Sequence, residues 1–187
     1  MRKGRSKKQI IAIESWEGAS PEPKAGMRSL LNFVTETNAT KYSYNFVYTP
    51  TELTYVVENI PTKDFSLLYF ALHGRPEKIN LGMYTEFEIT LDELAIMMGT
   101  RFKGFGVHFA SCAVMSSYEE TLRNFIDKTE VLFISGYERY VDFNESSLVD
   151  LALINRWMYA RNYKRMFENM QKSYKPMLIE NGFTYYI

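Results

Sequence analysis

Short apolar runs separated by helix-like segments constrain the fold of this chain more than any other feature of its sequence. Residues 67–72, 106–110 and 131–136 are short and mostly apolar, as expected of strands that are buried on both faces of a sheet. In the segment 24–37, apolar residues recur at helical spacing and give one face able to cover a sheet: Met27, Leu30, Leu31 and Val34. The alternation predicts a doubly wound, mainly parallel α/β sheet with helices on both faces.

Local signals place the other elements. We expect further strands at residues 9–13, 44–48 and 183–187, the last on an edge, and helices at residues 50–61, 90–99, 116–126 and 144–174. Thr90 and Glu93 form a capping-box pattern, which predicts a helix start, and Ser116 with Glu119 repeats the pattern.

Two segments depart from simple alternation. The stretches 78–82 and 85–89 are extended around a turn and predict a small β-hairpin after the third strand. The last helical pattern, residues 144–174, is long enough for two helices, and its first half carries apolar Leu148, Leu151, Ala152, Ile154, Trp157 and Met158.

Composition favours a single domain with a real core. We expect residues 1–8 to form a basic disordered tail and residues 9–187 to form a single α/β domain. The apolar stretch 10–13 is too short for the core of a signal peptide, and no stretch could span a membrane. Lys and Arg total 22, as do Asp and Glu, so no net field favours nucleic acid or a membrane as a partner. The single cysteine fits a reducing compartment, and we expect a cytoplasmic protein.

Two reactive side chains follow predicted strands. The run 66–72 stops at His73-Gly74, and the run 106–110 ends two residues before Cys112. Ligands bind outside the carboxyl ends of parallel strands, so both tips would face one cleft. A thiol needs a neighbouring base to become the nucleophile of an acyl transfer, and His73 is the candidate for that base. The spacing therefore predicts a cysteine–histidine dyad.

The same residues resemble a known family. An apolar strand followed by His73 and a glycine, then about forty residues later an apolar strand followed by Ser111-Cys112, is similar to the caspase-like cysteine peptidases (clan CD), including bacterial caspase-like and CHAT-type domains. The resemblance covers residues 10–157 and implies a caspase-like fold and a cysteine endopeptidase that uses Cys112 and His73. The chain departs from the best-known caspases at residues 113–115, which are not a Gly-rich turn, and it has no obvious acidic activation loop.

Other residues complete or delimit the predicted site. The backbone amides of Gly74 and Cys112 could form an oxyanion hole, because glycine lets a substrate carbonyl approach the main chain closely. His108 lies four residues before Cys112 on the same strand, roughly 13 Å away at ~3.3 Å per residue, so we expect a structural or surface role for it. One cysteine and two histidines without a carboxylate at ligand spacing predict no metal site, and we expect no cofactor.

Candidates for substrate binding lie at the other strand tips. The resemblance implies that the loop after the fifth strand helps to form the pocket for the residue before the scissile bond, and this loop holds Arg139 and Asp142. Asp142 would favour Lys or Arg there by charge-assisted pairing, or it would cap the helix that follows. Arg139 would instead favour an acidic residue. Glu14 and Trp16 follow the first strand and either line the same cleft or form a solvated turn with one packed ring.

Two other functions remain open. A domain of the same fold could be catalytically inactive and bind a partner peptide in its aromatic cleft. An unrelated flavodoxin-like or nucleotide-binding domain is disfavoured, because no Gly-rich phosphate loop follows the first strand and Glu14 and Glu17 would repel phosphate. The expected partner is thus a polypeptide substrate or partner protein, and the sequence leaves open whether the chain forms a homodimer.

Overall fold

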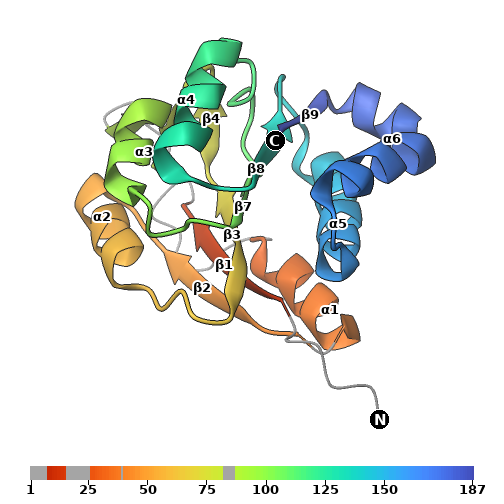
Figure 1. The fold of residues 1–187 in the computed structure, drawn as a ribbon, viewed down its shortest axis with the longest axis horizontal. Coiled ribbons are helices and arrows are strands. Elements are labelled where there is room, and N and C mark those ends of the chain that lie inside the picture. The colour runs from red at the N-terminus through yellow and green to blue at the C-terminus, as the bar shows by residue number, and fades with distance from the viewer. Residues whose placement is uncertain (1–7, 16–25, 39, 82–86) are drawn as a thin grey trace.

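A computed structural model describes residues 8–15, 26–38, 40–81 and 87–187 of the chain. Its central sheet has the order β2-β1-β3-β7-β8-β9 (Figure 1). The strands are β1 (Gln9–Glu14), β2 (Tyr42–Phe46), β3 (Phe65–Ala71), β7 (Gly106–Phe109), β8 (Phe133–Tyr137) and β9 (Phe183–Tyr186). All neighbouring pairs are parallel except β8 and β9, which confirms the predicted mainly parallel α/β sheet with an edge strand at the end.

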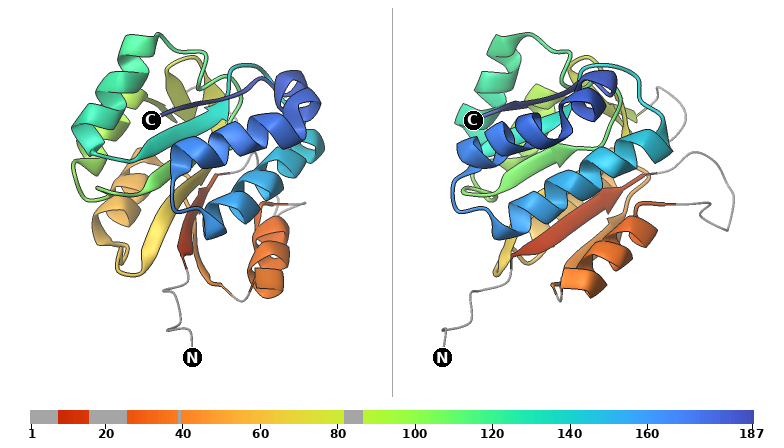
Figure 2. Two further views of the ribbon diagram at one scale, coloured as in Figure 1. Left: turned by 45° about the vertical axis from the view of Figure 1, so that its right-hand side comes forward. Right: turned by 90° about the vertical axis from the view of Figure 1, so that its right-hand side faces the viewer.

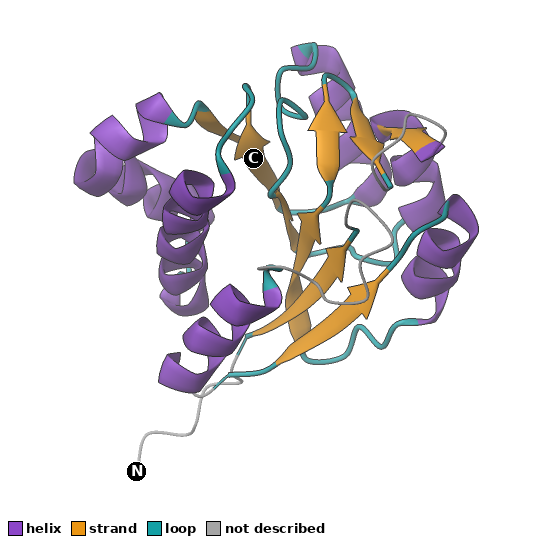
Figure 3. Cartoon of the chain, turned by 180° about the vertical axis from the view of Figure 1, so that it is seen from behind, coloured by secondary structure: helices purple, strands orange, loops and turns teal. Residues whose placement is uncertain are grey.

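Helices cover both faces of this sheet (Figures 1 and 3). One face carries α2 (Pro50–Asn59), α3 (Leu91–Met98) and α4 (Glu119–Thr129), and the other carries α1 (Arg28–Asn38), α5 (Phe143–Tyr159) and α6 (Tyr163–Glu180). Successive side chains of a strand point to opposite faces. Ile11 and Ile13 therefore join the core under α2 to α4, whereas Ile10 and Ala12 join the core under α1, α5 and α6.

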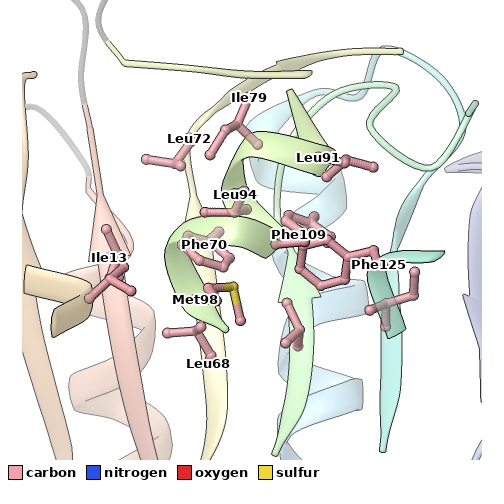
Figure 4. Close-up of a cluster of buried hydrophobic side chains, with 14 of the residues drawn as sticks. Ile13, Leu68, Phe70, Leu72, Ile79, Leu91, Leu94, Met98, Phe109 and Phe125 are labelled. Carbon is pink, nitrogen blue, oxygen red and sulfur yellow. The ribbon is translucent and has the colours of Figure 1, made fainter. Parts of the chain in front are cut away.

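The core under α2 to α4 reaches the ends of β3 and β7. Figure 4 shows Phe70 and Phe109 side by side between the sheet and α3, and their rings stack with centroids 5.5 Å apart. Phe109 also meets the ring of Phe125 from α4 edge-on. These rings are buried directly before the two strand tips that carry His73 and Cys112, so both tips extend from a rigid base.

A small antiparallel sheet follows β3 at once. Its strands are β4 (His73–Arg75), β5 (Lys78–Asn80) and β6 (Glu88–Thr90), in that order. The predicted hairpin is confirmed between β5 and β6, although part of its turn, residues 82–86, lies outside the described residues. Only Leu72 separates β3 from β4, so the chain leaves the main sheet at His73.

One of the two predicted capping boxes is confirmed and the other is wrong. Thr90 caps α3, with its hydroxyl accepting from the Glu93 amide and the Glu93 carboxylate accepting from the Thr90 amide. Helix α4 instead begins after Tyr118, which makes no side-chain cap hydrogen bond. The Ser117 hydroxyl donates to the Val114 carbonyl at 2.6 Å and accepts from the Glu77 amide at 2.9 Å. Ser117 therefore links the turn before β5, which contains Glu77, to the loop after β7, which contains Val114.

The long C-terminal helical pattern forms two helices, α5 and α6, which lie side by side over one face of the sheet (Figure 2). Helix α5 buries Val149, Leu153, Ile154 and Trp157, whereas Leu148 is 58% exposed. Among the described helices, none is both long and apolar enough to cross a membrane.

Lys8, the last residue of the expected basic tail, is anchored. Its ammonium donates to the Trp157 and Ala160 carbonyls at 2.9 and 2.7 Å and lies over the ring of Tyr163. Burial lowers the pKa of Lys8 to about 8. Residues 1–7 lie outside the described part of the chain.

Candidate active site

The site is built where three neighbouring parallel strands end. Glu14 at the end of β1 pairs with Ala71 at the end of β3, and the Ser15 amide donates to the Ala71 carbonyl at 3.2 Å. On the other side of β3, the Ala110 amide donates to the Phe70 carbonyl at 2.8 Å. The residues that follow β1, β3 and β7 therefore emerge at one edge of the sheet, the edge where parallel sheets bind ligands.

The residues after β3 and β7 are in direct contact. A Cβ placed on Gly74 would lie 2.4 Å from the Cys112 carbonyl oxygen and 2.5 Å from a methyl carbon of Val114. Only a residue without a side chain fits between the two segments. Gly74 thus lets the His73 segment lie directly against the Cys112 segment.

Cys112 and His73 line the same cavity, which has a volume of about 200 Å³. Its other lining residues come from the end of β1, the turn before α1, the β3–β4 junction, the segments after β7 and before α5, and α5 itself: Glu14, Ser15, Met27, Ala71, Leu72, Ala110, Val141, Phe143, Ser146 and Asp150. A drug-sized ligand usually occupies about 300–1,000 Å³, so this cavity is suited to a single side chain.

The thiol of Cys112 is half-buried and oriented by the loop before α5. The Val141 amide donates to Sγ at 3.5 Å, and Sγ lies 3.8 Å from the Val141 carbonyl oxygen. After the cysteine, the Ala113 amide donates to the Arg139 carbonyl at 3.0 Å and the Met115 amide to the Tyr137 carbonyl at 3.1 Å. The segment carrying the thiol is therefore fixed by main-chain hydrogen bonds to the end of β8.

Ala113 adopts a left-handed backbone conformation, with φ of +53°. This region is unfavourable for a residue with a Cβ, and such strain concentrates at functional sites. The sharp turn directly follows Cys112. The left-handed turn leaves the thiol at the edge of the sheet rather than inside a strand.

Glu14 is a buried carboxylate in the wall of the cavity, only 3% exposed. One oxygen accepts from the Tyr44 hydroxyl at 2.6 Å, and the other accepts from the Met27 amide at 3.2 Å. Burial and the hydrogen bond to Glu14 raise the pKa of Tyr44 above its ordinary value. Glu14 therefore lines the cleft, as one of the two sequence alternatives expects, and is no solvated turn residue.

Asp150 is a second buried carboxylate that lines the cavity, and it anchors a polar cluster between the sheet and α5. It accepts hydrogen bonds from the hydroxyls of Tyr69 and Tyr137, and its Oδ1 lies 2.7 Å from Nε2 of His108. The other ring nitrogen of His108 lies 3.0 Å from the Ser135 hydroxyl. His108 is thus a fully buried structural residue, as expected.

The two tyrosines of this cluster are held in their neutral form. Burial, and then the charge of Asp150, raise the pKa values of Tyr69 and Tyr137 well above the ordinary range. Both hydroxyls therefore remain donors to Asp150 up to strongly alkaline pH. The cluster fixes the position of α5, whose first turn contributes Phe143 and Ser146 to the cavity.

Two other predicted substrate-binding residues, Asp142 and Arg139, do not line this cavity. Asp142 is exposed and caps α5, with Oδ1 accepting from the amides of Asn144 at 2.8 Å and Glu145 at 3.2 Å. The side chain of Arg139 lies over Gly182 and lines a separate, more open hollow of about 740 Å³ beside α6. Trp16 lies outside the described residues.

Sequence reasoning missed Asp150. An acid inside a helix is usually on a solvated face, and the expected apolar face of α5 included Leu148, which is exposed, along with Ile154 and Trp157, which are buried. The usable signal is the row of Ser146, Asp150 and Trp157 at spacings of four and seven, which is the buried row of this helix. Among the described residues, no group of three or more His, Cys, Asp or Glu could hold a metal ion.

Comparison with known proteins adds a family but no activity. Among curated proteins, none matches the chain. A family model described as a family of unknown function, DUF6642, matches residues 37–187, a range that includes His73, Gly74 and Cys112 but not Glu14. Because the match spans most of its length, the chain belongs to the DUF6642 family.

Proposed function

We propose that this protein is a cysteine endopeptidase with a caspase-like fold that hydrolyses peptide bonds through Cys112 and His73. The observation that carries the proposal is that these two side chains, from separate strand ends, line one cavity. A thiol and an imidazole at the carboxyl edge of a parallel sheet are the groups that acyl transfer requires. The parallel order of the main sheet and the small sheet after β3 agree with the fold that the caspase-like resemblance implies.

Each residue has a chemical role in this proposal. His73 takes the proton from the Cys112 thiol, and the sulfur attacks the carbonyl carbon of the scissile bond. The oxyanion that forms is stabilised by the backbone amides of Gly74 and Cys112. His73 then donates its proton to the leaving amine, and a water molecule activated by the same imidazole hydrolyses the thioester.

The close approach of Gly74 to the Cys112 backbone supports this assignment. An oxyanion hole needs amides of both segments close together, and a side chain at position 74 would push the two segments apart. The contacts of Sγ with Val141 also support it, because they fix the direction of the sulfur before substrate binds.

The first test is thiol reactivity. Because Cys112 is the only cysteine, iodoacetamide labelling followed by mass spectrometry reports on this thiol alone. A thiol activated by His73 should alkylate rapidly well below pH 8, and His73→Ala should remove this reactivity. Arg75→Ala is the matched control on β4, because it removes only an exposed side chain paired with Glu88. Equal labelling rates of the His73→Ala variant and the wild type would contradict the dyad.

The second test is turnover. The full-length protein is incubated with a mixture-based library of peptides, and new amino termini are read by mass spectrometry. Cleavage should be lost in Cys112→Ala, with an unchanged thermal unfolding midpoint, since the half-buried thiol makes few contacts. Cleavage that persists in this variant would contradict the proposal that Cys112 is the nucleophile. A reactive thiol without cleavage of any peptide would favour the inactive, peptide-binding domain instead.

A further inference from the structure

The cavity at Cys112 combines apolar walls with buried acid. Six of its lining residues are apolar, namely Met27, Ala71, Leu72, Ala110, Val141 and Phe143. Two are carboxylates, Glu14 and Asp150, and they are only 3% and 1% exposed. A cavity with apolar walls and a buried carboxylate suits a long cationic side chain, because such a side chain has an aliphatic stem and a charged end.

The two carboxylates differ in how many further hydrogen bonds their oxygens can accept. Asp150 accepts from two tyrosine hydroxyls and also contacts Nε2 of His108, so its hydrogen bonds are directed into the protein. Among the described residues, Glu14 accepts one hydrogen bond on each oxygen, from Tyr44 and Met27. A carboxylate has about four acceptor positions, so Glu14 retains positions for a further donor.

Glu14 also lacks a cationic partner within the described part of the chain, where it forms no ion pair. Arg28 places its guanidinium over the ring of Tyr44, at 5.6 Å from the ring centre, and its side chain is exposed. Burial of a carboxylate is costly unless a cation or several donors compensate it. A guest with a positive charge would add such compensation.

We propose that the cavity receives a Lys or Arg side chain of the peptide, next to the scissile bond, and that Glu14 is the residue that selects it. This inference rests on the proposed peptidase function. Strand spacing places β1 about 10 Å from β7, two strands away, so only a long side chain beside Cys112 reaches Glu14. The volume of about 200 Å³ fits one such side chain.

In this assignment Glu14, and not Asp142 as the sequence suggested, selects a Lys or Arg side chain of the substrate. Asp142 is exposed, does not line the cavity, and uses one oxygen to cap α5. Glu14 is buried, lines the cavity and keeps acceptor capacity. A charge pair inside a desolvated cavity discriminates between side chains far better than one at an exposed helix end.

The experiment measures kcat/KM on fluorogenic peptides that differ only in the residue before the cleaved bond: Lys, Arg, Gln, Leu and Asp. The wild type should prefer Lys or Arg over Leu by at least about tenfold. Glu14→Gln keeps the size, keeps an oxygen that accepts from the Met27 amide and offers an NH2 group that can donate to the Tyr44 hydroxyl, but it removes the charge, and it should lower kcat/KM for Lys and Arg peptides by about 10- to 100-fold. The Leu peptide should change less than about threefold. Glu58→Gln, an exposed acid on α2, and Asp142→Asn are the matched controls and should keep the preference.

The outcomes separate this inference from the proposed function. Cleavage without preference for Lys or Arg, or a preference that survives in a folded Glu14→Gln protein, overturns the role of Glu14 and leaves the peptidase standing. Loss of the preference in Asp142→Asn also overturns it. Absence of cleavage for all five peptides, together with an unreactive thiol, overturns the peptidase and this inference with it. If Glu14→Gln does not fold, a wild-type enzyme without preference for Lys or Arg still overturns the inference.

Discussion

The α-carbon of Gly74 lies against the carbonyl oxygen of Cys112 so closely that a methyl group on it would be 2.4 Å from that oxygen. The contact joins the segment after β3 to the segment after β7, and those segments carry the imidazole and the thiol. A requirement for glycine beside the histidine is thus a packing requirement of this fold.

Replacing Gly74 by Ala should separate the two segments. Both the Cys112 carbonyl and Val114 would have to move, and overpacking of this kind costs about 1–3 kcal/mol of unfolding free energy. Urea unfolding measures the cost, and the iodoacetamide labelling rate of Cys112 reports on the displaced thiol. Arg75→Ala, one residue later and exposed, should cost less than about 1 kcal/mol. A Gly74→Ala protein as stable as the wild type would show that the segments separate freely.

The buried tyrosines should make stability fall at alkaline pH. The pKa values of Tyr69 and Tyr137 are raised in the folded state, so these groups keep their protons at a pH where they ionise in the unfolded chain. Their contribution is complete below pH 10, the ordinary value for tyrosine, and is lost as pH rises above it. The unfolding free energy should therefore decrease above pH 10 by up to ~1.4 kcal/mol per pH unit for each such tyrosine.

Variants identify the source of this slope. Tyr69→Phe should lower stability near pH 8, because Asp150 loses a donor, yet its stability should fall less steeply above pH 10 than that of the wild type. Tyr55→Phe, at a position that is 68% exposed, is the control and should reproduce the wild-type slope. Urea unfolding between pH 8 and 11 gives both quantities. Parallel curves for Tyr69→Phe and the wild type would exclude this linkage.

Asp142 should matter for stability through its cap. Asp142→Ala removes the acceptor for two amides at the start of α5 and should cost about 1 kcal/mol. Asn retains an oxygen at the same place and caps nearly as well, so Asp142→Asn should cost less than half as much. Thermal unfolding of the two variants gives the comparison. Equal losses would show that the charge, and not the capping oxygen, stabilises the helix end.

The sequence is informative where structure depends on neighbouring residues and uninformative where it depends on distant ones. Apolar runs predicted the strands because burial on both faces requires them, and Thr90 with Glu93 predicted the start of α3 because both cap bonds lie within four residues. Strand ends predicted that His73 and Cys112 share one edge. Parallel strands end together, so no long-range knowledge was needed.

Contacts between distant segments were beyond the sequence. The buried position of Asp150 could not be predicted, because its hydrogen-bond partners come from three different strands. The second capping box failed because α4 begins at Glu119, after Tyr118, so that Ser116 lies two residues before the cap position. The chain before this helix is held instead by Ser117, whose hydroxyl accepts from the Glu77 amide, forty positions earlier, and donates to the Val114 carbonyl.

Ser117 should accordingly stabilise the segment that carries the thiol. Ser117→Ala leaves the Glu77 amide and the Val114 carbonyl without this partner, and we expect a loss of about 1–3 kcal/mol of unfolding free energy. Ser116→Ala is the matched control at the preceding exposed position and should change stability by less than about 0.5 kcal/mol. The labelling rate of Cys112 should change only in Ser117→Ala, because Ser117 closes the turn that begins at the cysteine. Equal stability of the two variants would mean that this turn is held by the main chain alone.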